Sequence, residues 1–194
     1  MTDAGCSFIQ RKEFAAKEKI CYDFNSFVYG MEAKNKELHR VSLTAIIYKD
    51  GKYLLLRRSL NKKAFPGKWT VPGGGLKTDD YLNLPKTTPD HWYFAAENAL
   101  RREIEEETGL DVGKIKYLLD ITFIRPDGIP VVILSYYCDY KSGDVKLDED
   151  NIDYVWASYQ DCKNYDLVEG LLAEIEMVDK IIKGESPDKV KYNY

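Results

Sequence analysis

Two apolar runs flank Asp50-Gly51 in the stretch VSLTAIIYKDGKYLLLRRS. Both runs are rich in β-branched and aromatic residues, a pattern that predicts a β-hairpin around this dipeptide. The stretch KWTV predicts another strand that ends in three glycines. Two further strands are expected near 115–124 and 129–139, on either side of the turn RPDGIP, and a short one at DYVWA.

Helical spacing of apolar residues predicts two helices among these strands. The first runs from about Trp92 to Thr108 and ends at Gly109. The second is amphipathic, runs from about Asp166 to Lys183, and carries its apolar stripe at Val168, Leu171, Leu172, Ile175, Val178 and Ile182. The pattern therefore predicts an α/β domain over 39–184 and a C-terminal tail over 185–194. Residues 1–38 form an N-terminal extension, either an arm that binds a partner or a flap that covers the core.

Composition excludes several classes of function. The net charge of −4, without a basic cluster, argues against a nucleic-acid polymer as partner. Four scattered cysteines and two histidines predict neither a zinc site nor a disulfide framework. Because no apolar window approaches the roughly 18 residues of a membrane span, we expect a cytoplasmic protein that does not bind membranes.

The acidic stretch RREIEEETGL at 101–110 is the main candidate for chemistry. On a helix, Glu103, Glu106 and Glu107 continue the side of the alanines at 95, 96 and 99 and do not lie on the opposite, solvated side. Carboxylates at spacings of three and four repel one another, and those that face the interior need a cation. Two interpretations follow: salt bridges, with Arg102 reaching Glu106, or a hard divalent ion such as Mg²⁺ or Mn²⁺.

Residues 102–110, REIEEETGL, resemble the second half of the Nudix box, Gly-x5-Glu-x7-R-E-U-x-E-E-x-G-U with U aliphatic, and match all nine positions. The stretch PGKWTVPGGG resembles the segment that leads into that box. The first half departs from the pattern, because Asp80 stands where the family has glutamate. From Gly74 to Arg102 the chain is also about fourteen residues too long, which predicts a box over 74–110 with an insertion at about 81–94.

This resemblance implies a Nudix α/β/α sandwich with a mixed β-sheet and the hydrolysis of a nucleoside diphosphate linked to another group X. It also implies Mg²⁺ or Mn²⁺ held by box glutamates and a backbone carbonyl. Arg102 is expected to hold a box carboxylate in place, and Glu103 is either a ligand or the base that orients water. The predicted metal ligands are Glu103, Glu106, Glu107 and Gly73; the predicted substrate contacts are Arg57, Arg58 and Lys68; the candidates for an additional acid are Asp80, Glu149 and Asp150, with Asp148 chemically equivalent.

Three functions are consistent with these residues. The preferred one is a metal-dependent pyrophosphohydrolase for nucleoside triphosphates, because the context GKWTVPGG resembles that of small enzymes that cleave such nucleotides. The second is the same chemistry on ADP-ribose or a nucleotide sugar, with the insert or the arm completing a pocket in a homodimer. The third is a Nudix-fold module that binds a nucleotide and regulates without catalysis.

Overall fold

The fold starts from the predicted hairpin. The computed structural model describes residues 38–193, so the arm expected over 1–38 lies almost entirely outside the described residues. Strands β1 (Arg40–Lys49) and β2 (Lys52–Arg58) meet at Asp50 and Gly51. Both turn residues have positive φ, +49° and +73°, as the tight two-residue hairpin turn requires. The hairpin prediction is confirmed.

The two hairpin strands separate beyond the turn and enter different parts of a mixed sheet. β1 pairs in parallel with β7 (Pro130–Ser142) and antiparallel with β4 (Gly73–Gly75). β2 pairs antiparallel with β3 (Trp69–Thr70) and β8 (Asn151–Ser158). β5 (Asp111–Val112) and β6 (Lys116–Ile124) complete the sheet by pairing with β7. The glycine strand β4 is thereby placed directly beside β1.

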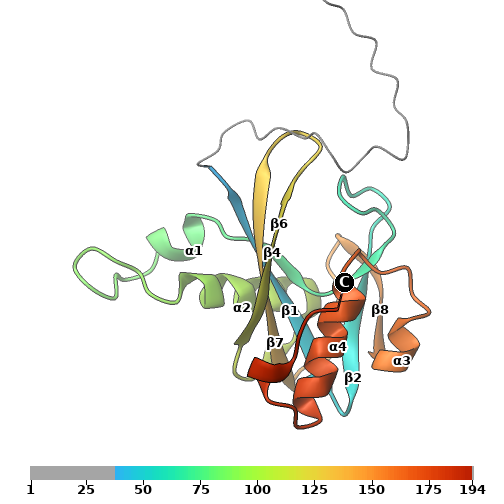
Figure 1. The fold of residues 1–194 in the computed structure, drawn as a ribbon. Coiled ribbons are helices and arrows are strands. Elements are labelled where there is room, and N and C mark those ends of the chain that lie inside the picture. The colour runs from blue at the N-terminus through green and yellow to red at the C-terminus, as the bar shows by residue number, and fades with distance from the viewer. Residues whose placement is uncertain (1–37, 194) are drawn as a thin grey trace, which may run out of the picture. The chain divides into compact units, whose positions relative to one another are not determined.

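Two helices cover the two faces of this sheet (Figure 1). α2 (Ala95–Thr108) packs Leu100 and Ile104 against one face, and α4 (Leu171–Ile182) packs Ile175 and Val178 against the other. Residues alternate between the faces along each strand, so that Leu54 lies toward α2 and Leu55 toward α4. The architecture is the predicted α/β/α sandwich. Shorter helices are α1 (Asp79–Leu82), α3 (Tyr159–Cys162) and the 3₁₀ helix η1 (Pro187–Lys189).

Both long helices begin later than the sequence predicted. α2 starts at Ala95, not near Trp92, because Phe94 has a φ of +63° that a helix cannot contain. α4 starts at Leu171, five residues after Asp166, because Gly170 has a φ of +84°. The carbonyl of Asp166 instead accepts a hydrogen bond from Trp69 N in β3, at 2.9 Å.

The segment predicted to be inserted forms α1 in part and then a loop over 83–94 that leads into α2 and projects away from the sheet (Figure 1). The predicted C-terminal tail is attached to the domain: Val190 is buried, and the Tyr192 hydroxyl donates to Gly170 O at 3.2 Å. Within residues 38–193, no helix is long and apolar enough to cross a membrane.

Candidate active site at the glycine strand and helix α2

The glycines of β4 let α2 approach the sheet. A Cβ on Gly74 would lie 2.2 Å from Cδ of Glu103, so the Glu103 carboxyl group occupies the space that a side chain would fill. A Cβ on Gly73 would lie 2.1 Å from the Leu43 carbonyl oxygen in β1. The glycine run that follows the predicted strand thus brings a backbone strand and a helix carboxylate together.

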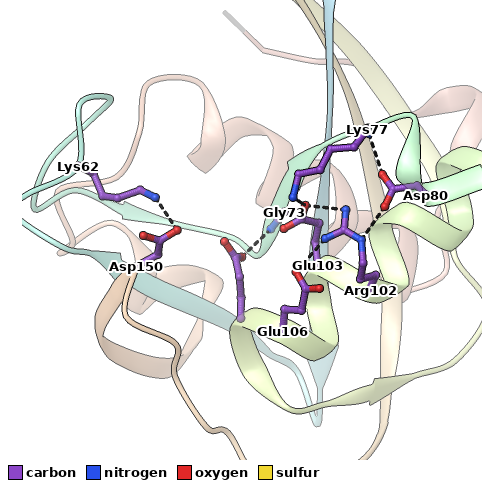
Figure 2. A network of polar contacts seen from close by, with 9 residues as sticks. Lys62, Gly73, Lys77, Asp80, Arg102, Glu103, Glu106 and Asp150 are labelled. Atoms are coloured by element: carbon purple, nitrogen blue, oxygen red, sulfur yellow. Dashed lines mark hydrogen bonds and ion pairs between the residues drawn. The ribbon is translucent and has the colours of Figure 1, made fainter.

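Arg102 is the centre of an ion-pair network on α2 (Figure 2). Its Nε lies 2.6 Å from Asp80 Oδ1 and its Nη1 2.8 Å from Glu106 Oε2. Nη2 lies 2.9 Å from Glu103 Oε1, close enough for an ion pair although not aligned as a hydrogen bond. The predicted pair with Glu106 is present. One guanidinium therefore faces three carboxylates.

Asp80 enters this network from α1. Its side chain is 4% exposed, and its other oxygen accepts a hydrogen bond from the Lys77 backbone N–H at 2.7 Å. Burial acts to raise the pKa of Asp80, but the bonds from Arg102 and Lys77 outweigh it and hold the pKa below its usual value. Asp80 is thus a charged anchor for Arg102, in the place where the box pattern has glutamate.

Glu107 is held differently. Its Oε2 accepts a hydrogen bond from Gly73 N at 2.9 Å, and it forms no ion pair with any residue in 38–193. Burial, against the opposing effect of the Gly73 N–H and together with the negative charges of Asp148 and Glu103, raises the pKa of Glu107 to about 7. The effects of burial and of the neighbouring negative charges thus outweigh the Gly73 N–H and the positive charge of Arg58.

The backbone N–H and C=O of Gly73 both face the region of the Glu107 carboxyl. Gly73 lies opposite Thr44 of β1, and the hydrogen bond from Ala45 N goes to the Pro72 carbonyl, at 2.9 Å. Gly73 and Thr44 are therefore a non-hydrogen-bonded pair, in which the N–H and C=O of Gly73 both point away from β1. The carbonyl predicted as a metal ligand is directed to the same side as the N–H that meets Glu107.

The three loop acids differ in what they contact. Glu149 is exposed, and Asp150 forms an ion pair with Lys62 at 2.5 Å (Figure 2). Asp148 is the one whose charge acts on Glu107, and it is fixed by Asp150 N at 3.1 Å and Asn151 Nδ2 at 3.0 Å. Among the loop acids, Asp148 is therefore the one linked electrostatically to Glu107, which the spacing to the next strand could not indicate.

The three basic residues also separate. Arg58 follows an irregularity in the pairing of β2 with β8; its Nε donates to Ala64 O at 2.9 Å, and its charge acts on Glu107. The Nε of Arg57 donates to Gly67 O at 3.4 Å. Lys68 is paired with Asp166 at 2.5 Å. All three predicted substrate contacts thus have a partner within the chain, and Arg58 is the one whose charge acts on Glu107.

The donor set suits a hard divalent cation, because it consists of carboxylate oxygens and a backbone carbonyl. Glu103 is buried and Glu107 half-buried, as their place on the side of the alanines predicted. For Glu106 this prediction was wrong, because its side chain is 56% exposed. Within 38–193, no three Asp, Glu, His or Cys side chains gather in a geometry that could hold an ion. The cause is local: Arg102 attracts Glu103 and Glu106, and the Gly73 N–H holds Glu107.

A mixed sheet between two helices, with a glycine strand against an acidic helix, is the arrangement expected from the resemblance to the Nudix family. The family model of the NUDIX domain matches residues 38–175, and the chain belongs to the Nudix family. It is a Nudix hydrolase, of the class that acts on phosphoanhydrides.

The relatives and structural neighbours agree with this assignment. Nucleoside triphosphatase NudI of Klebsiella pneumoniae (strain 342) is 33% identical over 138 residues, which cover 66% of this chain and 88% of the relative. The crystal structure of a MutT protein from Methanosarcina mazei Go1 is 27% identical with a TM-score of 0.58, covering 77% of this chain and 99% of that one. The NUDIX domain of Shewanella oneidensis NrtR, complexed with ADP ribose, shares the fold at 20% identity and a TM-score of 0.57, covering 83% and 99%.

Proposed function

We propose that this protein is a metal-dependent pyrophosphohydrolase that cleaves nucleoside triphosphates. The observation that carries the proposal is the carboxylate array on α2: Arg102 faces three carboxylates, and Glu107 beside them has no cation of its own. Such an excess of negative charge is suited to a divalent ion. The similarity to a nucleoside triphosphatase supports the choice of substrate.

The chemistry follows from the charge of the substrate. A polyphosphate repels an attacking hydroxide, and a bound Mg²⁺ or Mn²⁺ supplies positive charge and lowers the pKa of water. Glu103, Glu106, Glu107 and the Gly73 carbonyl are the proposed ligands, with Asp148 as an additional acid. Arg102, tied to Asp80, positions Glu103 and Glu106, and Arg58 supplies positive charge toward the substrate phosphates.

One observation favours ADP-ribose or a nucleotide sugar as the second candidate. The loop before α2 exposes Tyr93 and Phe94, at 56% and 73%, and either ring offers a face on which a second planar group can stack. A non-catalytic binding module is the third candidate, and the charge array on α2 argues against it, since binding alone does not require these carboxylates.

A substrate panel separates the three. Nucleoside triphosphates, ADP-ribose, nucleotide sugars and dinucleoside polyphosphates are incubated with Mg²⁺, Mn²⁺ or EDTA, and the products are identified by chromatography. We expect cation-dependent cleavage of triphosphates to a monophosphate and pyrophosphate. Exclusive cleavage of ADP-ribose or sugar nucleotides would select the second candidate. Nucleotide binding with no cleavage of any compound would select the third.

A further inference from the structure

A buried carboxylate on α4 has no role in the site described so far. Glu174 is 5% exposed and lies on the stripe of α4 that faces the sheet, between Leu171 and Val178, where an apolar residue is expected. Its Oε2 accepts a hydrogen bond from the Ser135 hydroxyl of β7 at 2.5 Å. No ion pair involves Glu174 within residues 38–193, and its second oxygen has no hydrogen-bond partner there.

Such a group is costly for a purely structural role. The Ser135 hydroxyl supplies one hydrogen bond, and the second oxygen is not among the fully buried, unpartnered atoms of residues 38–193, so it keeps contact with solvent. Burial raises the pKa of Glu174, which the Ser135 hydroxyl only partly opposes. A ligand that donates N–H groups can therefore reach the second oxygen of this carboxylate.

Strand register connects Glu174 to the proposed active site. Thr44 of β1 pairs with Gly73 of β4 on one side and with Ser135 of β7 on the other. Adjacent strands are about 4.8 Å apart, so Ser135 lies roughly 10 Å across the sheet from the Gly73 backbone that meets Glu107. A nucleoside bridges such a span with its ribose and base.

The sheet face between these points is small and polar. Residues opposite one another in register share a face, so Gly73, Thr44 and Ser135 all lie on the α4 side. Ser42 and Thr44 are only partly buried, so solvent reaches this face. Glycine and hydroxyl side chains leave room for a planar ligand and offer it hydrogen bonds.

From this juxtaposition we infer that Glu174, oriented by Ser135, reads the base of the nucleotide whose phosphates lie at the glycine strand. The inference rests on the proposed function and specifies the substrate class. A carboxylate accepts hydrogen bonds, and the amino groups of guanine, cytosine and adenine donate them. Uracil and thymine offer a single N–H between two carbonyl oxygens, which the carboxylate repels. The protein therefore prefers bases that carry an amino group.

The test compares GMP, CMP, AMP and UMP binding by titration calorimetry in EDTA, followed by kcat/KM for the corresponding triphosphates with Mg²⁺. For the wild-type protein we expect affinity for at least one amino-bearing base to exceed that for UMP about tenfold or more, because a donor-reading site rejects analogues that leave it unpaired. Glu174→Gln, which adds a donor at the same size, should reduce this ratio at least fivefold. Ser135→Ala should weaken binding of the preferred base.

The chain supplies a matched control on the same helix. Asp179 is also buried on α4 and also accepts from a hydroxyl, that of Tyr53 at 2.9 Å, but Lys183 pairs with it and it lies more than a helical turn beyond Glu174. Asp179→Asn should leave the base preference unchanged. Circular dichroism checks that both proteins, wild-type and Glu174→Gln, are folded. If the ratio of the affinity for the preferred base to that for UMP is the same in the wild-type protein and in Glu174→Gln, the inference is overturned, even if triphosphates are cleaved. A changed binding ratio without any hydrolysis supports the inference and refutes the proposed function.

Discussion

Removal of the Arg102 guanidinium should destabilise the protein more than removal of any surface arginine. In Arg102→Met the apolar stem is kept, and Asp80 and Glu103, with side chains 4% and 11% exposed, lose their shared cation. Loss of one partner from a buried ion pair costs about 3–5 kcal/mol. Because Arg102 keeps 28% exposure and Glu106 is largely exposed, we expect the lower end, about 3 kcal/mol.

The assay is thermal and urea unfolding in EDTA at neutral pH, followed by tryptophan fluorescence. A loss of about 3 kcal/mol in a domain of this size lowers Tm by roughly 6–12 °C. The matched control is Arg125→Met, which removes an exposed pair with Asp127 at 2.8 Å and should cost at most about 1 kcal/mol.

A double variant isolates the cause. Asp80→Asn combined with Arg102→Met removes the buried negative charge together with its partner, so it should recover about 1–3 kcal/mol relative to the sum of the single changes. Equal losses in Arg102→Met and Arg125→Met, or strict additivity in the double variant, would refute the anchoring role of Arg102.

Three further predictions concern the same site. Glu107→Gln should lower kcat for the preferred substrate by about two orders of magnitude or more, measured as initial rates at saturating Mg²⁺, with a normal rate contradicting the ligand assignment. In EDTA, wild-type stability should fall as pH rises from about 5 to about 8: the folded pKa of Glu107, about 7, lies above its ordinary value, so the folded state binds the extra proton and loses that advantage as the proton leaves. Urea unfolding across this pH range measures how steeply stability falls, and Glu107→Gln should make the fall less steep. An unchanged slope in Glu107→Gln would show that Glu107 is not the group responsible. Gly73→Ala should lower Tm more than Gly74→Ala. The Cβ at position 73 meets the Leu43 backbone, whereas the Cβ at position 74 meets the end of the Glu103 side chain, which can move at the expense of activity. The reverse order of Tm values would be inconsistent with this close approach.

Local sequence signals predicted much of the fold. The Asp50-Gly51 turn, the end of α2 at Gly109 and the turn at Gly128 are all fixed by residues that accept positive φ, and each appears where it was expected. The helix starts were wrong because Phe94 and Gly170 adopt positive φ, which the spacing of apolar residues does not reveal. Trp92 Nε1 donates to Leu84 O, and Asp166 pairs with β3, so both residues are removed from helices that their spacing had suggested.

In the candidate site, too, local features could be predicted from the sequence and other features could not. The box glutamates could be located from spacing on one helix, and so could the Arg102–Glu106 pair, which is four residues apart. The effect of Asp148 on Glu107 and the bond of Glu174 to Ser135 could not, because they join residues far apart in the sequence. Glu174 did leave a signal, a carboxylate on the buried stripe of an amphipathic helix, which the prediction of that helix passed over.

Metal-dependent cleavage is tested most directly by the ³¹P NMR spectrum of a nucleoside triphosphate incubated with the wild-type protein and Mg²⁺. Growth of monophosphate and pyrophosphate signals, absent in EDTA and nearly absent with Glu107→Gln, is the predicted result. Triphosphates that persist unchanged with Mg²⁺ and with Mn²⁺, or that are cleaved equally in EDTA, would contradict the account.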